Sequence, residues 1–173
     1  RKMWPIFRKK MENKKNKLMS NYFNDDLNYG LIDESSFLKG QLTIQKIIED
    51  NEINLVYGGA FNNKKCYFME PVLVKANDHD KEVFHNEYFL PLLSVYTYEP
   101  NEKMNILKLC TKNNNNYCLT GSIFSKDKEF IIEANEILKY SAGNFYINDK
   151  STGAIVGQQP FGGSGKSGTN DKA

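Results

Sequence analysis

Apolar side chains recur at helical spacing in two segments of the first half of the chain. Residues 1–18 carry a partial apolar stripe among many Lys and Arg residues, which predicts a surface helix with a solvated cationic face. A second helix is predicted to begin at Asp33, a suitable N-cap, and to end near Asn51. Ile32 and Phe37 are placed for a hydrophobic staple at its start. The positions at helical spacing in this second helix are Phe37, Gln41, Ile44, Ile47 and Ile48.

Two further helices are predicted in the second half of the chain. Residues 102–112 keep an apolar face, and a fourth helix begins at Ser125 as its cap and ends with Gly143 as its C-terminal glycine. The inward positions are Met104, Leu107 and Cys110 or Thr111 in the third helix, and Phe130, Ala134, Ile137 and Leu138 in the fourth.

Short runs rich in β-branched and aromatic residues alternate with these helices and predict strands. The run 67–74 contains Pro71, which favours an edge strand or an irregular one. The other runs are 53–57, 92–98, 121–124 and 145–147. This alternation predicts an α/β domain with an open, mostly parallel sheet flanked by helices. Sites in such sheets lie beyond the carboxyl ends of the strands, where the loop after Ile147 begins.

That loop is rich in glycine, with six glycines between Gly153 and Gly168. Gly/Ser-rich composition is typical of flexible linkers. Here, however, the glycines are interrupted by residues that a linker does not need, namely Ile155, Val156, Gln158, Gln159, Pro160 and Phe161. We therefore expect an ordered loop whose backbone approaches a ligand.

A phosphate-binding loop is an alternative interpretation, because Gly165, Lys166 and Ser167 match the end of that motif. The motif also needs a glycine at the position of Pro160, and a helix directly after the loop. Residues 168–171 are poor helix formers. Both the spacing and the context argue against a phosphate-binding loop.

Composition limits the class of protein. With 173 residues, of which 40% are hydrophobic and 25% charged, the chain is long enough for one globular domain with a core. The formal net charge of +2 is too small to indicate nucleic acid or a membrane surface. No apolar run approaches the ~20 residues of a transmembrane helix. We expect neither nucleic acid nor a membrane as a partner.

The cysteines and histidines give no sign of a metal site. Cys66, Cys110 and Cys118 are odd in number and lack metal-site spacing, so incidental thiols in a reducing compartment are expected. His79 and His85 lie in charged stretches with no further ligand nearby. We therefore assign no metal and give neither histidine an acid/base role.

The run 143–172 resembles the end of the catalytic domain of aldehyde dehydrogenases. The Gly-Asn-aromatic segment at residues 143–145 and the Pro-Phe-Gly-Gly sequence at 160–163 are similar to the family in general. The longer string TGAIVGQQPFGG at residues 152–163, with SGTNDK at 167–172, resembles only the 1-pyrroline-5-carboxylate (glutamate semialdehyde) dehydrogenase branch. The resemblance extends over nearly the whole chain and is stronger from Tyr67 onward.

The resemblance implies that residues 1–173 are the C-terminal portion of an aldehyde dehydrogenase-like catalytic domain. The N-terminal helix looks like the one that shortly follows the family's nucleophilic cysteine. The cysteine and the general-base glutamate are then expected upstream of Arg1, so no catalytic residue is assigned here. The NAD-binding domain and the C-terminal oligomerisation strand are also expected to lie outside these residues. We expect this chain alone to be inactive.

The resemblance also implies a cofactor site before the apolar run 92–98. Glu87 would accept hydrogen bonds from the nicotinamide ribose hydroxyls of NAD, and Phe89 would pack beside the nicotinamide. Leu90 departs from the glycine that the family has there, which puts the local backbone in question. From the residues alone, Glu87 is more commonly a surface or helix-terminal acid.

For the substrate, the resemblance implies an anchor for the amino-acid end of the semialdehyde. The backbone of Gly153 and Ala154 would donate N–H groups to the α-carboxylate, and Phe161 would pack along the aliphatic chain. Some relatives carry serine at the position of Ala154, so one side-chain hydrogen bond is lost here. The alternative is that Phe161 only fastens the loop to the core.

The implied function is the NAD-dependent oxidation of L-glutamate γ-semialdehyde to L-glutamate in proline catabolism. The full-length protein would be a homo-oligomer, in the mitochondrial matrix of a eukaryote or in the cytoplasm of a bacterium. The alternative from another class is a non-catalytic module that binds an amino acid or an anion through the glycine-rich loop.

Overall fold

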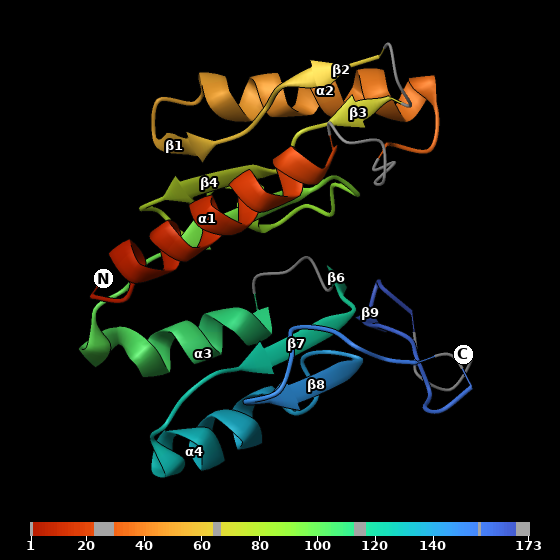
Figure 1. Ribbon diagram of the computed structural model, residues 1–173. Helices are drawn as coiled ribbons and strands as arrows, with labels where there is room; N and C mark the ends of the chain where they lie inside the picture. Colours follow the sequence, from red (N-terminus) through yellow and green to blue (C-terminus); the bar gives the residue numbers. More distant parts are fainter. Residues whose placement is uncertain (1, 23–29, 64–66, 113–116, 156, 169–173) are drawn as a thin grey trace. The chain divides into compact units, whose positions relative to one another are not determined.

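The computed structural model describes residues 2–22, 30–63, 67–112, 117–155 and 157–168. These residues form two compact units, each of which contains helices and strands (Figure 1). The N-terminal unit comprises Arg1–Val83 and Tyr88–Thr97. The C-terminal unit comprises Phe84–Glu87 and Tyr98–Ala173.

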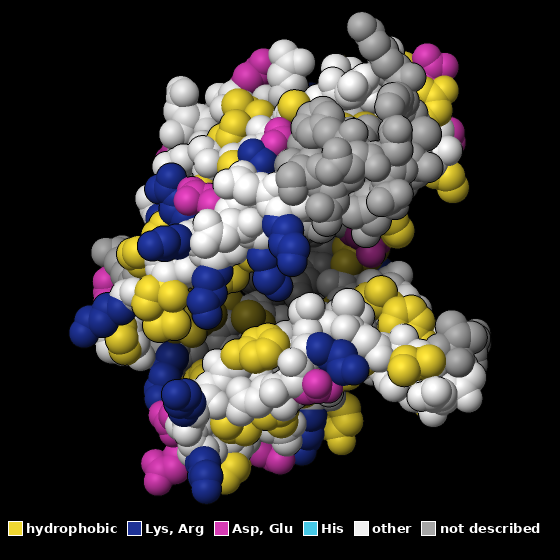
Figure 2. Space-filling view, viewed as in Figure 1, with side chains coloured by type: hydrophobic (Ala, Val, Ile, Leu, Met, Phe, Trp, Pro, Cys, Tyr) yellow, Lys and Arg dark blue, Asp and Glu magenta, His cyan; other side chains and the backbone are white. Residues whose placement is uncertain are grey.

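Helix α1 (Trp4–Tyr22) is the predicted cationic surface helix. Figure 2 shows Lys and Arg side chains on the surface in dark blue. The exposed basic side chains of α1 include Arg8, Lys9, Lys10 and Lys14. Lys15 differs from these, because its Nζ lies 2.7 Å from Oε1 of Glu70 and 5.2 Å from the ring centroid of Tyr57. The Lys15 and Glu70 side chains are only 22% and 13% exposed, so this ion pair fastens α1 to the rest of its unit.

Helix α2 (Glu34–Glu49) begins where the sequence predicts, because the Asp33 carboxylate accepts a 2.7 Å hydrogen bond from the Ser36 backbone N–H. That bond holds the pKa of Asp33 below its ordinary value. The predicted hydrophobic staple is wrong, since Ile32 is 91% exposed. The residues that α2 buries are Phe37, Gly40, Ile44 and Ile47.

Three strands form the main sheet of the N-terminal unit, in the order β1 (Ile53–Tyr57), β4 (Val72–Ala76) and β5 (Leu92–Tyr96). β4 is antiparallel to β1 and parallel to β5. The predicted run 67–74 is interrupted at Pro71, which lies between β3 and β4, so of the two predicted alternatives the irregular strand is confirmed; β4 itself is the central strand and not an edge. A proline in this position removes no hydrogen bond from the sheet.

A second, smaller pair of strands in the N-terminal unit contacts α2. β2 (Phe61–Asn62) and β3 (Phe68–Met69) form a second, antiparallel pair, and the Phe61 ring meets the Phe37 ring edge-on at 5.5 Å. Gly58 has a φ of 89°, and a Cβ there would lie 2.0 Å from the Pro71 carbonyl oxygen, so only glycine fits. Fully burying an aliphatic or aromatic side chain stabilises the fold by about 1.5–3 kcal/mol. The buried hydrophobic residues of this unit include Phe37, Ile44, Ile47, Phe68, Met69, Val72, Leu73, Val74 and Val83.

The C-terminal unit packs two helices on a parallel pair of strands. The short helix η1 (Glu82–Phe84) contains residues of both units, because the division falls after Val83. The elements of the C-terminal unit are η2 (Pro100–Glu102), α3 (Lys103–Lys112), β6 (Tyr117–Cys118), β7 (Thr120–Ile123), α4 (Lys128–Leu138), β8 (Asn144–Ile147) and β9 (Ser164–Gly165). The core consists of Leu107, Ile123, Ala134 and Leu138, against which Met104, Phe130, Ile137 and Phe145 pack. Cys110 and Thr111, predicted as alternatives for an inward position, are both exposed.

Both predicted ends of α4 are corrected by the structure. The helix is capped by Asp127, whose Oδ1 accepts a 3.1 Å hydrogen bond from the Phe130 N–H, and not by Ser125. Ser125 instead accepts a bond from the Asp127 N–H through its hydroxyl, at 3.1 Å. The helix ends at Lys139 in right-handed geometry, so Gly143 is not its C-terminal glycine.

Asn148 joins the carboxyl ends of β7 and β8. Its Oδ1 accepts from the Ser125 N–H and its Nδ2 donates to the Ser125 carbonyl, both at 2.8 Å. Its own N–H donates to the Ile123 carbonyl at 2.8 Å, and its φ is 53°. Asn tolerates this left-handed conformation better than most residues. The side chain therefore extends the pairing of β7 and β8 by one residue and fixes the start of the glycine-rich loop.

The predicted α/β class is confirmed, and the helices and strands lie close to their predicted positions. The pairing is more mixed than an open, mostly parallel sheet implies. β4 with β5 and β7 with β8 are parallel, whereas β1 with β4, β2 with β3 and β6 with β9 are antiparallel. Within the described residues, no helix has both the length and the apolar character needed to cross a membrane.

Candidate functional site

Phe89, a predicted cofactor residue, is presented to solvent by an unusual backbone. Its ring is 86% exposed and its φ is 50°. A bulky residue in the left-handed region is uncommon and costs conformational energy. An exposed aromatic ring held in such a conformation is typical of a residue that meets a ligand rather than the core. Glu87, the other predicted cofactor residue, belongs to the C-terminal unit and is exposed.

The segment around Phe89 is anchored on both sides. The Tyr88 hydroxyl donates to the Glu82 carbonyl at 3.2 Å. After Phe89, the Leu92 N–H donates to the Leu90 carbonyl at 2.7 Å. The Pro91 carbonyl accepts a 2.8 Å bond from the Val72 N–H, at the start of the central strand β4. The backbone is thus fixed immediately before and after the exposed ring.

Leu90, which departs from the family glycine, is accommodated by α2. Gly40 on α2 is buried, and a Cβ at that position would lie 2.9 Å from Cδ2 of Leu90 and 3.2 Å from Cδ1 of Leu31. Gly40 therefore leaves the space that the Leu90 side chain needs. The departure at Leu90 adds a side-chain anchor for the segment that carries Phe89.

The predicted substrate loop follows β8 and the Asn148 clamp. Gly153 and Ala154 are half-buried, with Gly153 outside the left-handed region. Its lack of a side chain matters for a different reason, because a Cβ there would lie 2.1 Å from Cδ of Lys150. Val156, in the same loop, lies outside the described residues.

Phe161 lies between two backbone contacts with the start of β8. The Asn144 side chain donates from Nδ2 to the Pro160 carbonyl at 3.3 Å. Gly143 lies so close to the Gly162 carbonyl that a Cβ would stand 1.7 Å from its oxygen. The loop is therefore fastened through its backbone on both sides of Phe161, whose side chain is 39% exposed.

The loop then returns to the C-terminal unit as β9, which pairs with β6. The Lys166 ammonium lies 5.4 Å from the ring centroid of Tyr117 in β6. The Ser167 N–H donates to the Ser164 carbonyl at 3.1 Å, so Gly165, Lys166 and Ser167 form a turn after a strand residue. The helix that a phosphate-binding loop requires would fall in residues 169–173, which lie outside the described residues.

The described cysteines lack the features of a reactive nucleophile. Cys110 is an exposed residue, but its thiol is partly shielded from water. This desolvation, and to a lesser extent the nearby Cys118, raises the pKa of the Cys110 thiol. A raised pKa leaves less thiolate, the nucleophilic form, at neutral pH. Cys66 lies outside the described residues.

Contrary to the sequence analysis, His79 has carboxylate groups close to its ring, those of Asp78 and Asp80. Ligand atoms of Asp78, His79 and Asp80 lie within 4.8 Å of one another, and His79 Nδ1 is 2.8 Å from Asp80 Oδ1. The His79 ring also meets Tyr96 edge-on at 5.9 Å. Exposed acidic groups are commonly found together without a metal. The contact of the imidazole with the carboxylate and the aromatic ring accounts for its position.

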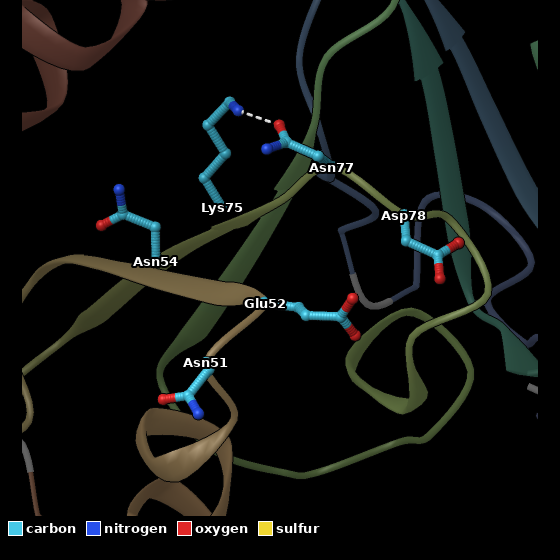
Figure 3. Close-up of a pocket in the computed structure, with 6 residues that line it drawn as sticks. All are labelled: Asn51, Glu52, Asn54, Lys75, Asn77 and Asp78. Atoms are coloured by element: carbon cyan, nitrogen blue, oxygen red, sulfur yellow. Dashed lines mark hydrogen bonds between the residues drawn. The ribbon is translucent and has the colours of Figure 1, made fainter.

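A polar hollow of about 460 Å³ lies beside this cluster (Figure 3). Lys75 donates to the Asn77 side chain across it, and both residues stand where β4 ends. The lining residues are Asn51, Glu52, Asn54, Lys75, Asn77 and Asp78. None of them was predicted as a site residue, and the mixed charges of the lining select no class of ligand.

Comparison with known proteins identifies the family. The model of the aldehyde dehydrogenase family matches residues 1–173. This chain belongs to the aldehyde dehydrogenase family. It is similar to the mitochondrial delta-1-pyrroline-5-carboxylate dehydrogenase of Danio rerio, with 43% identity over 142 residues, which are 82% of this chain and 25% of that one. The predicted resemblance is confirmed.

Solved structures give the same result. The crystal structure of the delta-pyrroline-5-carboxylate dehydrogenase from Mycobacterium tuberculosis matches with a TM-score of 0.74 and 39% identity, over 83% of this chain and 26% of that one. The structure of that enzyme bound with NAD matches with a TM-score of 0.72 and 38% identity, over 83% of this chain and 25% of that one. The chain thus spans about a quarter of the length of these aldehyde dehydrogenases.

Sequence reasoning missed several residues that hold the predicted substrate loop in place. Asn148 was not singled out as a site residue and Gly143 was predicted as a helix end, but Asn148 bonds to Ser125 after β7 and Gly143 makes the close contact with Gly162 of the loop. Asn144 was noted only as part of the family segment. Its side-chain amide donates to the Pro160 carbonyl, 16 residues away in the sequence. The periodicity of apolar residues gives no signal for such a contact.

The contact between Gly40 and Leu90 predicts non-additive effects on stability. Gly40→Ala should gain about 1 kcal/mol from helix propensity, but overpacking against Leu90 should offset this by about 1–3 kcal/mol. In a Leu90→Ala background the closest contact is gone and only Leu31 Cδ1, at 3.2 Å, remains, so Gly40→Ala should be more favourable there than in the wild type. Chemical denaturation of the four proteins of this double-mutant cycle measures the coupling. The same effect of Gly40→Ala in both backgrounds would show that Leu90 does not occupy the space beside α2.

Proposed function

We propose that this chain is the C-terminal portion of the catalytic domain of an NAD-dependent aldehyde dehydrogenase that oxidises L-glutamate γ-semialdehyde (1-pyrroline-5-carboxylate) to L-glutamate in proline catabolism. The observation that carries this proposal is the loop 148–163, whose sequence resembles that enzyme branch. The loop is clamped at its start by Asn148 and near its end by Gly143 and Asn144. The similarity to proteins named delta-1-pyrroline-5-carboxylate dehydrogenases supports the same substrate.

The residues available for NAD fit that cofactor. The exposed Glu87 carboxylate can accept hydrogen bonds from two ribose hydroxyls, and the exposed face of the Phe89 ring can pack against a flat heterocycle. NAD, when bound, supplies the acceptor for the hydride that leaves the substrate. A ring held by a fixed backbone needs little reorganisation when it meets the cofactor.

The residues available for the substrate fit a carboxylate followed by an aliphatic chain. Successive N–H groups at Gly153 and Ala154 can receive the α-carboxylate as an anion-binding nest. The partly exposed Phe161 ring can cover the methylene groups without needing a hydrogen-bond partner. Fastening of the loop through the Pro160 and Gly162 backbone favours this role over the alternative that Phe161 only anchors the loop.

We further propose that the nucleophilic cysteine, the general-base glutamate, the NAD-binding domain and the oligomerisation strand lie in other parts of a longer protein. The coverage of about a quarter of each relative supports this, as does the raised pKa of Cys110. The complete enzyme would be a homo-oligomer. The mitochondrial relatives favour the mitochondrial matrix in a eukaryote, and the cytoplasm is proposed for a bacterium. No observation favours the alternative of a non-catalytic binding module.

The function is tested by comparing the 173-residue chain with the complete enzyme. NADH formation from glutamate semialdehyde, followed by absorbance, should occur with the complete enzyme and be absent with the chain alone, because catalysis needs an activated thiolate. Turnover by the chain itself, abolished by Cys110→Ser or Cys66→Ser, would contradict the assignment of the nucleophile to another segment. Lack of turnover by the complete enzyme would contradict the proposed substrate.

Glu87→Gln in the complete enzyme should weaken the use of NAD. The variant keeps the shape of the side chain but loses charge-assisted acceptance of the ribose hydroxyls, so kcat/KM for NAD should fall on the order of tenfold. The matched control is Glu133→Gln, on the exposed surface of α4. Titrations with NAD that give equal constants for Glu87→Gln and the wild type would place Glu87 outside the cofactor site.

Phe161→Ala in the complete enzyme should change substrate choice more than stability. Loss of the ring removes a contact with the aliphatic chain of the anchored substrate, so kcat/KM should fall far more for glutamate semialdehyde than for a simple aliphatic aldehyde. Tyr140→Ala, which removes another exposed aromatic side chain of the same unit, serves as the control. Equal losses with both aldehydes, with a lowered Tm, would instead identify Phe161 as a support of the fold.

A further inference from the structure

Lys150 folds back over the loop that follows it. An added Cβ at Gly153 would lie 2.1 Å from Cδ of Lys150, 2.9 Å from Cε and 3.0 Å from Nζ. The last methylene groups of the lysine and its ammonium therefore lie directly against the backbone of Gly153. Most surface lysines extend into water, where their rotamer entropy is retained.

The absence of a side chain at position 153 leaves room for the exposed Lys150 side chain in this conformation. The φ of Gly153 lies outside the left-handed region, so the backbone conformation does not require glycine there. A side chain at this position would instead occupy the space of Lys150. Such a side chain would therefore displace the Lys150 side chain from its place over the loop.

The charge of Lys150 is not balanced within the described part of the chain. Among the described residues, no carboxylate forms an ion pair with its ammonium. Lys166 of the same loop is different, because it lies over the Tyr117 ring. An ammonium that lies against the Gly153 backbone and has no carboxylate partner among the described residues is positioned to attract an anion.

The position of this ammonium is set by the fold. Asn148 is bonded to both the N–H and the carbonyl of Ser125. These bonds fix the chain at Asn148, two residues before Lys150. The lysine therefore starts from a defined backbone position, as a residue that recognises a ligand requires.

We propose that Lys150 is a specificity-determining residue whose ammonium pairs with the α-carboxylate of the aldehyde substrate at Gly153 and Ala154. The choice of glutamate semialdehyde as that substrate rests on the function proposed above, whereas the recognition of a carboxylate rests on the contact between Lys150 and Gly153. The backbone N–H groups orient the carboxylate, and the lysine supplies the positive charge that favours carboxylate-bearing aldehydes over neutral ones.

The test measures KM and kcat of the complete enzyme with three aldehydes. Glutamate semialdehyde and succinic semialdehyde carry a carboxylate, and butanal does not. Lys150→Met keeps the methylene chain and removes the charge, so it should raise KM on the order of tenfold for both carboxylate-bearing aldehydes and change it less than about twofold for butanal. Lys150→Arg should retain most of the preference, because it keeps the positive charge.

Gly153→Ala tests the position of the lysine independently. This variant keeps the backbone N–H but places a methyl group where the Lys150 side chain lies. It should raise KM for the carboxylate-bearing aldehydes in the wild type and add little in the Lys150→Met background. Full additivity of the two changes would show that they act separately and would contradict the pairing.

The outcomes separate this proposal from the proposed function. Wild-type turnover of glutamate semialdehyde with an unchanged KM in Lys150→Met, or equal losses with all three aldehydes, would overturn the role of Lys150 and leave the function intact. Activity with succinic semialdehyde but not glutamate semialdehyde, sensitive to Lys150→Met, would overturn the substrate and support the lysine. If the wild type oxidises neither carboxylate-bearing aldehyde and calorimetry detects no binding of L-glutamate, both proposals are overturned.

Discussion

The C-terminal unit depends on the contact between two backbones at Gly143 and Gly162. A Cβ on Gly143 would lie 1.7 Å from the Gly162 carbonyl oxygen and 2.8 Å from the Cα of Gly163, so no other residue fits without movement of the chain. This contact brings the end of the glycine-rich loop against the start of β8. Because Asn148 fixes the other end of the loop, residues 149–161 project from two points of one short strand. The site gains its rigidity from backbone contacts, which leaves the side chains of the loop available for a ligand.

The N-terminal unit presents Phe89 by a different means. Its central strand β4 is buried between β1 and β5, and Pro91 bonds to the first residue of that strand. The rigid core thus fixes the segment in which Phe89 adopts its left-handed conformation. Conformational strain of this kind persists only where the surrounding structure determines the backbone. Within its own unit, each of these two segments is held at the end of a strand: Phe89 before β5 and the proposed substrate loop after β8.

Elements with a strong local signal were predictable from the sequence. β1 was predicted at its observed bounds, and α2 begins at the predicted Asp33 cap. These features depend on residues close together in the sequence: the run of β-favouring residues, the helical spacing of apolar residues and the capping side chain. Ile32 and Ser125 were misassigned although each satisfied a local rule: Ile32 is 91% exposed, and Asp127, two residues after Ser125, caps the helix instead. The roles of Gly143 and Gly40 could not be predicted, because a glycine required for close approach looks the same in a sequence as one required for a turn. The site residues came from resemblance to a family, and the structure added Lys150, which no periodicity singles out.

The packing of Leu90 on Gly40 also limits how this chain can change over evolutionary time. Positions 40 and 90 are distant in sequence, but the side chain of one occupies the space left by the other. A lineage that begins with glycine at position 90 can acquire leucine there without a clash only after position 40 has become small. The reverse order passes through an intermediate with two side chains competing for one space. The two positions should therefore covary among relatives.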